Sequence, residues 1–361
     1  MCRGRLSTCR VMPHEMSDGT KTGAVAVTLD SQTAHSRLAR MGAGIVGALG
    51  EAASQFSTSA GLPDTSIVIR ITDDFVPEVE ASSRSELPPF TTERYGGGVA
   101  GITLPPLRDC TKRFVLLNAT VFTMDHTWTF VHLPAVLAHE VAHCLIELCR
   151  QRAGDPRGYS GRPMDLLEAV SQSALTVCDE YLADELAKSL LPPFDVTLSN
   201  DEGESLTSDR VLLGVDALAR MRDALDENVY PALRGRVLRY CETGDDLDGM
   251  IEHLRNAIPA SLILSAHYRA AVRELPPTDE SAHVADHPAT RLYLEPFWDR
   301  VGPVLDERLH GPLWSHFAQC DQQALDVATE AMIAFWAALG ISLEPQGEGR
   351  VYVHVGEPNG G

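Results

Sequence analysis

The spacing of hydrophobic residues predicts one amphipathic helix and several short strands in the first third of the chain. Between residues 35 and 56, apolar side chains recur every three or four positions, as on one face of a helix. Short runs rich in apolar or β-branched residues predict strands. The predicted strands are residues 24–29, 66–71, 99–104, 113–122 and, near the end of the chain, 351–355. Residues 76–94 are polar and contain several prolines, so a loop is expected there.

The middle of the chain predicts two long helices. The first is expected to begin at Pro134, because a proline ring suits the first turn of a helix, and to run to Arg152. After a turn rich in glycine and proline, the second runs from Pro163 to about Leu191, where Pro192 and the next proline end it. The short turn lets the two helices pack side by side.

The rest of the chain is expected to be mostly helical and to contain two polar linkers, at residues 194–208 and 276–288. The predicted helices are residues 209–230, 247–258, 260–274 and, in pieces, 292–339. The predicted fold class is therefore α+β, with a small mixed sheet in the first half. We expect a disordered tail at residues 1–22, a first domain at 23–193 and a helical C-terminal region at 209–361.

Composition narrows the classes of partner. The chain has 361 residues, with 50 acidic against 30 basic side chains and a formal net charge of −20. Such a charge repels phosphate backbones and anionic lipid, so nucleic acid is not expected as a partner. No apolar run approaches the roughly 18 residues that a membrane span needs, and the N-terminus lacks the apolar core of a secretory signal. The eight cysteines are scattered without a C-x-x-C pair, which indicates a reduced cytoplasmic protein.

The first helix in the middle of the chain carries the motif H-E-x-x-H at His139, Glu140 and His143. Two histidines four residues apart lie on one helical face, so both imidazoles can reach one metal ion. The glutamate between them can act as general base on a water molecule that zinc activates. The remaining positions of this helix are apolar, as expected for a buried catalytic helix. We therefore predict a Zn²⁺ site with Glu140 as the catalytic base.

A catalytic zinc ion needs a third protein ligand and an open fourth position. The residues after His143 do not continue the motif as H-E-x-x-H-x-x-G-x-x-H, because neither the glycine nor the third histidine is present. The third ligand must therefore come from elsewhere in the chain. The second long helix offers Glu180, with Asp184 one turn later in a position to accept the other N–H of a ligand histidine. Glu168, Asp179 and Asp184 are the competing candidates for the third ligand on the same helix.

H-E-x-x-H followed by E-x-x-A-D at Glu180–Asp184 resembles the pattern of gluzincin metallopeptidases, including the HtpX-like group. The continuation to Pro192 also resembles the corresponding helix of ImmA/IrrE-like peptidases, in which an asparagine stands where this chain has Asp184. The resemblance covers about residues 99–193 and implies a zincin-like catalytic domain with ligands His139, His143 and Glu180. HtpX-like enzymes are membrane-embedded, whereas this chain has no matching apolar run, and its helical C-terminal region resembles neither group.

The resemblance also implies an edge strand above the metal that pairs with an extended peptide or protein substrate, a form of strand addition. Residues 99–104 and 113–122 are the two candidates for that edge. Stabilising the oxyanion needs a further hydrogen-bond donor. The available candidates are Tyr159, His267, Tyr268 and Arg269, each of which is more commonly an ordinary packing residue.

Several other residues invite a functional interpretation. Gly42–Gly47 fits the dinucleotide pattern G-x-G-x-x-G but lies inside the first amphipathic helix, where a small-residue face packing against the sheet is the simpler explanation. Cys144 and Cys178 flank the motif helices and are expected to be buried apolar-like residues. His126 and His132 precede the motif and can line a cleft.

The sequence leaves three hypotheses open. The first is a cytoplasmic zinc metallopeptidase. The second is a catalytically silent zincin-fold protein that acts as a protein-interaction module, in which any metal has a closed coordination shell. The third, a nucleotide-dependent oxidoreductase, depends on Gly42–Gly47 alone. The intact Glu140 favours the first. The sequence does not determine the substrate or the oligomeric state.

Overall fold

A computed structural model of the full chain supplies the coordinates. The structure describes the following residues: 25–30, 36–82, 93–94, 97–104, 112–124, 126–153, 165–191, 197–199, 205–207, 210–272, 277–310, 317–347 and 350–359.

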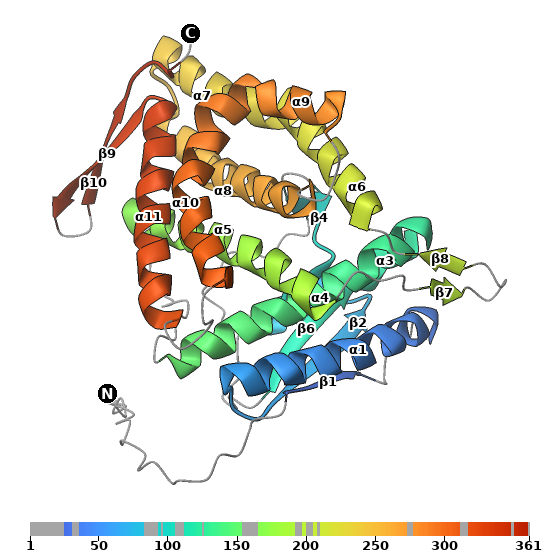
Figure 1. Ribbon diagram of the computed structural model, residues 1–361. Coiled ribbons are helices and arrows are strands. Elements are labelled where there is room, and N and C mark those ends of the chain that lie inside the picture. The colour runs from blue at the N-terminus through green and yellow to red at the C-terminus, as the bar shows by residue number, and fades with distance from the viewer. Residues whose placement is uncertain are drawn as a thin grey trace, which may run out of the picture.

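Helices make up most of the described residues, and a small mixed sheet completes an α+β fold (Figure 1). The helices are α1 (Ser36–Ala60), α2 (Phe75–Ser82), α3 (Ala119–Met124), α4 (His126–Arg152), α5 (Leu166–Leu190), α6 (Arg210–Asp223), α7 (Tyr230–Thr243), α8 (Leu247–Val272), α9 (Asp279–Asp286), α10 (Glu295–His310) and α11 (Phe317–Ala338), with π-helical segments at Ala224–Val229 and Thr290–Leu294. The strands are β1 (Val25–Leu29), β2 (Thr65–Thr72), β3 (Glu93–Arg94), β4 (Gly97–Gly98), β5 (Gly101–Thr103), β6 (Lys112–Asn118), β7 (Thr197–Ser199), β8 (Ser205–Thr207), β9 (Ile341–Gly347) and β10 (Arg350–Val355).

Four strands form the central sheet in the order β1-β2-β6-β5. β1, β2 and β6 run parallel, whereas β5 pairs antiparallel with β6 and forms one edge. β2 alternates buried and half-buried positions along most of its length, so one face of the strand is fully packed and the other is only partly covered. The structure thus decides between the two candidates for the edge, because β5 lies at residues 101–103 and β6 is internal.

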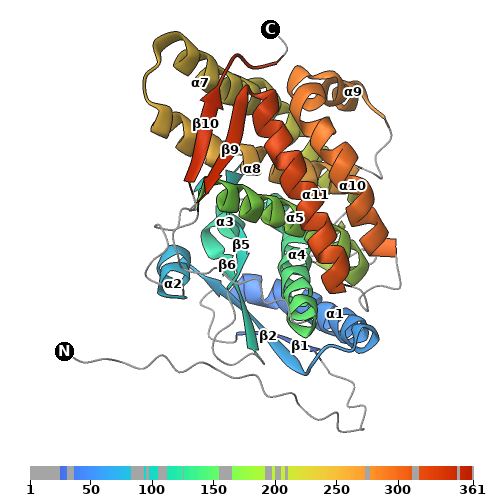
Figure 2. The ribbon, with the colours of Figure 1, turned by 90° about the vertical axis from the view of Figure 1, so that its left-hand side faces the viewer.

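Helices cover both faces of the sheet (Figure 2). α1 and α4 pack on one face, where Leu49, Ile69 and Leu137 are among the buried side chains of the main core. α2 packs on the other face, where Phe75 and Val79 join Leu116 in a second, smaller apolar cluster. The motif helix α4 is therefore fixed between the sheet and the helices that follow it.

The C-terminal helices pack on α5 rather than standing apart from it. α8, α10 and α11 all contact α5, and the main apolar core runs from β1 through α4 and α5 to α11 without interruption. Tyr181 on α5 is fully buried and donates a hydrogen bond of 2.8 Å to Asp306 on α10. The segments before and after the predicted division at residues 193–209 therefore share one apolar core.

Two prolines expected to bound helices lie inside them. α4 begins at His126 and continues through Pro134, and α8 is one helix through Pro259 rather than two. A proline in a helix interior removes one hydrogen bond and costs about 3 kcal/mol. Continuous rows of buried residues offset that cost, with Leu133 and Leu137 on α4 and Ile258 and Leu262 on α8. The prediction that Pro134 begins the helix was therefore wrong.

Both predicted linkers and the predicted loop contain regular structure. α2 lies within the predicted loop, where Phe75 and Val79, one turn apart, supply its only buried face. α9 lies within the second linker, and Thr278 begins it with a capping box that pairs Thr278 with Ser281. The first linker contains the short hairpin β7–β8. The sequences of α2 and α9 are polar because each of these helices buries few residues.

The remaining differences concern ends of elements. β6 ends at Asn118, and α3 begins at the next residue. The last part of the strand predicted at residues 113–122 is therefore helical. The final predicted strand pairs with β9 in an antiparallel hairpin. Among the described residues, no helix is both long enough and apolar enough to cross a bilayer.

Candidate metal centre

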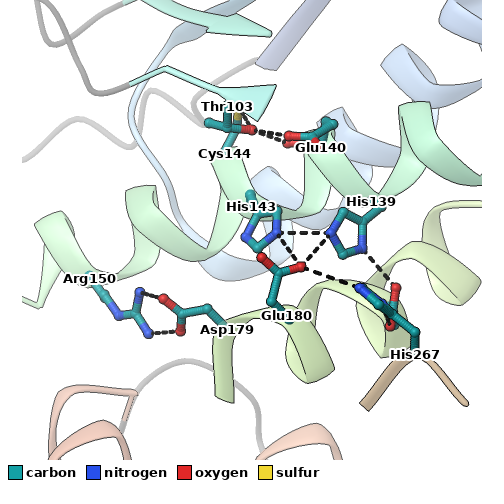
Figure 3. Close-up of polar contacts among 10 residues, drawn as sticks. Thr103, His139, Glu140, His143, Cys144, Arg150, Asp179, Glu180 and His267 are labelled. Atoms are coloured by element: carbon teal, nitrogen blue, oxygen red, sulfur yellow. Dashed lines mark hydrogen bonds and ion pairs between the residues drawn. The ribbon is translucent and has the colours of Figure 1, made fainter. Parts of the chain in front are cut away.

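Three side chains from α4 and α5 bring their donor atoms to one point (Figure 3). The Nε2 atoms of His139 and His143 lie 3.0 Å apart. Oε2 of Glu180 lies 3.1 Å from the Nε2 atom of His139 and 3.6 Å from that of His143. The i, i+4 spacing on α4 aims both imidazoles at α5, and α5 presents Glu180 between them.

These separations fit a tetrahedral zinc ion. Zn–N and Zn–O bonds of about 2.0–2.2 Å at tetrahedral angles put neighbouring donor atoms about 3.3–3.5 Å apart. The three observed separations, 3.0, 3.1 and 3.6 Å, bracket that range. Two nitrogen donors and one carboxylate oxygen are also a usual donor set for a catalytic zinc. The residues present therefore fit the metal that the sequence implies.

The other acidic candidates on α5 have different partners. Glu168 forms the capping box with Asp165 at the start of α5, more than three turns, or about 18 Å, before Glu180. Asp179 makes two hydrogen bonds to the guanidinium of Arg150, which joins α5 to α4. Of the four acidic candidates for the third ligand, Glu180 is the residue that points at both histidines.

Asp184 lies one turn after Glu180 and holds two imidazoles at once. Its Oδ1 atom is 2.7 Å from Nδ1 of His139, and its Oδ2 atom is 2.7 Å from Nδ1 of His267 on α8. With Nδ1–H of His139 donating to the carboxylate, the Nε2 atom of that ring can offer its lone pair to a metal ion. Asp184 thus contacts His139, as the sequence led us to expect, and also contacts a second histidine, His267.

His267 brings a fourth donor to the same cluster. Its Nε2 atom lies 3.9 Å from Oε2 of Glu180, and donor atoms of His139, Glu180 and His267 all lie within 4.8 Å of one another. The separations within the set that contains His143 are shorter and closer to tetrahedral distances than the 3.9 Å between His267 and Glu180. His267 is also more open, with 39% of its side chain exposed against 15–20% for that set.

The charged groups in this cluster shift one another's pKa values. Burial alone lowers the pKa of His139, but the carboxylates of Asp184 and Glu180 raise it well above its ordinary value. Burial likewise opposes the charged form of Glu180, yet the two imidazoles of α4 hold its pKa well below the ordinary range. The same balance lowers the pKa of Asp184 and raises that of His267. Such reciprocal shifts occur in functional clusters and also in structural ion-pair networks.

Glu140 lies on a different side of α4 from the two histidines and faces β5 (Figure 3). The hydroxyl of Thr103 is 2.9 Å from its Oε2 atom, and only 7% of Glu140 is exposed. A Cβ atom at Gly101 would come within 3.1 Å of Cγ and Oε1 of Glu140. The candidate base is therefore held between α4 and the edge strand.

The remaining sequence candidates do not join the cluster. Tyr159 lies outside the described residues, and so does the side chain of His126. Arg269 stacks over Trp298, 5.4 Å from the ring centroid, and Tyr268 packs against the main core. His132 lies 3.6 Å from Asp216, and burial lowers its pKa to about 4. Of the oxyanion candidates within the described part of the chain, His267 is the one that lies at the cluster.

The two cysteines near the motif helices are buried, as predicted. Burial raises the pKa of the Cys144 thiol strongly, and its Sγ atom lies 4.0 Å from the hydroxyl of Thr103, on the β5 side of α4 (Figure 3).

The glycine pattern at Gly42–Gly47 lies within α1, which has already begun at Ser36. It therefore does not connect a strand to the start of a helix, as a dinucleotide site requires. A Cβ atom at Gly44 or Gly47 would meet nothing within 4 Å, so these glycines do not pack against the sheet either. The expectation of a small-residue packing face was wrong for both.

A second histidine pair, which the sequence did not single out, lies near the end of α9. Nε2 of His283 is 3.3 Å from both carboxylate oxygens of Asp226, and Nε2 of His287 is 3.5 Å from Oδ1 of the same residue. Nδ1 of His287 accepts a hydrogen bond of 3.1 Å from the backbone N–H of Ala289. This pair shares its spacing with the motif histidines but has a different environment.

Comparison of the chain with protein-family models, with curated proteins and with solved structures found no match in any of the three. A functional assignment for this chain therefore depends on the geometry of the site.

Proposed function

We propose that this protein is a zinc-dependent metallopeptidase with a zincin-like catalytic domain. The observation that carries this proposal is the convergence of His139 Nε2, His143 Nε2 and Glu180 Oε2 within 3.0–3.6 Å of one another. Three protein ligands leave a fourth position for a water molecule or substrate, which is the arrangement of a catalytic zinc site. When bound, zinc would lower the pKa of a coordinated water molecule toward neutrality.

Glu140 is the proposed general base. It directly follows the ligand His139 on α4, and a nearly buried carboxylate between helix and strand is shielded from bulk water. In peptide hydrolysis it would accept the proton of the attacking water and pass it to the amine nitrogen that leaves. Its side chain is the part of the site that makes it catalytic rather than merely metal-binding.

His267 is the proposed donor to the oxygen of the scissile carbonyl. Its Nδ1 atom is fixed by Asp184 at 2.7 Å, so its other ring nitrogen is directed toward the ligand cluster. The carboxylates around it raise its pKa against the effect of burial, which favours the protonated, donating form. As negative charge develops on the carbonyl oxygen, a fixed N–H donor at this position stabilises it.

The edge strand β5 supports an extended peptide as the substrate. Leu104 N–H bonds to Phe114 and the carbonyl of Ala100 accepts from Asn118, so even-numbered residues of this segment pair with β6. The backbone groups of Gly101 and Thr103 therefore point to the open side of the sheet. No strand pairs with that side within the described part of the chain. An extended substrate adding there would run beside α4.

A catalytically silent protein with a structural metal is the second candidate, and His267 is the observation that favours it. A third imidazole, that of His267, lies close to Glu180 Oε2 and could enter the coordination shell after a small movement and close it. Such a protein would bind zinc without hydrolysing peptides, and the helical C-terminal region would then serve a protein partner.

The two candidates are distinguished by measuring hydrolysis of a mixed peptide library together with zinc content. We expect activity that a chelator removes and zinc restores. Glu140→Gln should keep about one zinc per chain and lose about 100- to 10,000-fold in kcat. The matched control is Glu147→Gln, on the same helix but paired with Arg113. A folded wild type that holds zinc and cleaves nothing in the library would contradict the peptidase proposal and favour the structural metal.

A further inference from the structure

The short strand β5 faces the catalytic helix with two side-chain positions, Gly101 and Thr103. Because side chains alternate along a strand, these two share one side, and both contact Glu140. Ile102 between them packs against the second apolar cluster on the opposite face of the sheet. The same two residues direct their backbone groups to the open edge, so one short segment faces both the candidate base and the candidate substrate strand.

Thr103 is the hydrogen-bond partner of the Glu140 carboxylate (Figure 3). Its hydroxyl lies 2.9 Å from Oε2 and 3.0 Å from the backbone carbonyl oxygen of the same glutamate. Among the described residues, no other side chain donates a hydrogen bond to this carboxylate. The hydroxyl can therefore fix the side-chain torsions of Glu140 from outside the helix.

Gly101 confines the same side chain from the other direction. Its missing Cβ atom would stand 3.1 Å from both Cγ and Oε1 of Glu140 and 2.9 Å from Cδ2 of Leu117. Any larger residue would crowd the carboxylate or displace Leu117. The side chain of Glu140 thus lies between the hydroxyl of Thr103 and the backbone of Gly101.

We propose that Thr103 is a positioning residue for the general base, so that the strand expected to receive the substrate also holds Glu140 in place. This inference rests on the proposed peptidase function. A base held in one orientation loses less entropy on reaching the transition state, and small misplacements are costly in rate. Strand addition along β5 would bring the substrate to Glu140 in a fixed register.

A purely structural role for Thr103 predicts something different. In that case the hydroxyl would donate to the backbone carbonyl of Glu140 and simply tie β5 to α4. Valine would then lower the stability by the same amount whether or not residue 140 carries a carboxylate, because the backbone carbonyl is present in both cases. A positioning role predicts a loss that depends on the Glu140 carboxylate and that appears in kcat, and serine, which keeps the hydroxyl, should avoid it.

The first experiment compares the peptidase kinetics of Thr103→Val and Thr103→Ser, with zinc content measured in each. We expect kcat to fall about 10- to 100-fold in the valine variant with KM nearly unchanged. The serine variant should stay within about three-fold of wild type. The control is Thr65→Val on β2, whose hydroxyl donates to the backbone carbonyl of Pro63 and touches no carboxylate. Equal activity of the valine and serine variants would overturn the proposal.

The second experiment needs no activity. Unfolding midpoints are measured on chelated wild type, Thr103→Val, Glu140→Leu and the double variant. If the hydroxyl serves the carboxylate, the valine substitution should destabilise the wild type and have almost no further effect in the leucine background. Additive effects would show a tie to the backbone and overturn the proposal.

The two results also separate this inference from the proposed function. Wild type without zinc or hydrolysis would contradict the peptidase assignment and with it any catalytic role of Thr103, even if the midpoints were coupled. Active wild type with additive midpoints would contradict the role of Thr103 alone.

Discussion

His139 and His143 share their four-residue spacing and an aspartate partner with His283 and His287. In the first pair, His139 directs Nδ1 to Asp184 and leaves Nε2 facing a glutamate and a second imidazole. In the second, Nδ1 of His287 accepts a backbone N–H, so the ring proton resides on Nε2 and is directed at Asp226. His139 can offer the lone pair of Nε2 to a metal ion, whereas the Nδ1 lone pair of His287 already accepts a backbone hydrogen bond.

Exposure and charge separate the two pairs further. His283 and Asp226 are half exposed, whereas the motif cluster is mostly buried. Asp184 and Glu180 raise the pKa of His139 against its burial, while burial lowers the pKa of His287. The comparison teaches that spacing alone does not make a metal site. The partner of the second ring nitrogen decides whether the first can bind.

The largest effect that separates the two pairs is expected from His267, which belongs to the first cluster through Asp184. His267→Ala should lower kcat about 100- to 1,000-fold, as loss of an oxyanion donor does, and leave the zinc content unchanged. His283→Ala, on α9, is the matched control and should have no effect. An active His267→Ala enzyme would remove the oxyanion role, and a change in the Co²⁺ absorption spectrum would identify His267 as a ligand instead.

A smaller effect is expected from the aspartates. Asp184→Asn should weaken zinc binding about 10- to 100-fold, because the amide no longer fixes the ring of His139 through a charged hydrogen bond. Asp226→Asn should leave zinc affinity unchanged. Competition with a chromophoric chelator measures both affinities. Equal affinities in the two variants would show that Asp184 does not orient a ligand.

The smallest expected effect is on the pH dependence of stability in chelated protein. Raised pKa values mean that His139 and His267 stabilise the fold fully below about pH 6.5, their unfolded value, and lose this contribution as the pH rises through their folded values. Glu180 has a lowered pKa, so its contribution persists until the pH falls below its ordinary range. His287 has the opposite sign and gains stability as the pH rises.

Urea unfolding of chelated wild type between pH 6 and 9 measures this dependence, with Asp184→Asn as the control. Stability should decline with rising pH in the wild type and decline less in the variant. A wild type whose stability rises steadily across this range would contradict the charge arrangement of the first cluster.

The sequence predicted the part of the site that lies on two adjacent helices. H-E-x-x-H fixes a helical face by local geometry alone, and Glu180 with Asp184 shares a face for the same reason. His267 could be named only as one of four possible donors, because its place depends on how α8 packs on α5. Thr103 carried no signal at all, since its contact with Glu140 joins residues 37 positions apart.

The fold was predictable where apolar periodicity is long and failed where few residues are buried. α1, β2 and α5 follow strong patterns and lie close to their predicted bounds. α2 and α9 are short and bury few residues, so their sequences carry little apolar periodicity and look like linkers. Helix ends were wrongly predicted at Pro134 and Pro259. Buried residues on either side of each proline stabilise a continuous helix.

The measurement that tests the account most directly is the zinc content of four purified proteins: wild type, His139→Ala, Glu180→Ala and His287→Ala. We expect about one zinc per chain in wild type and in His287→Ala, and none retained by the other two variants after dialysis. Zinc retained by Glu180→Ala would contradict the proposed ligand set. Zinc lost from His287→Ala, or absent from folded wild type supplied with zinc, would contradict the distinction between the two histidine pairs.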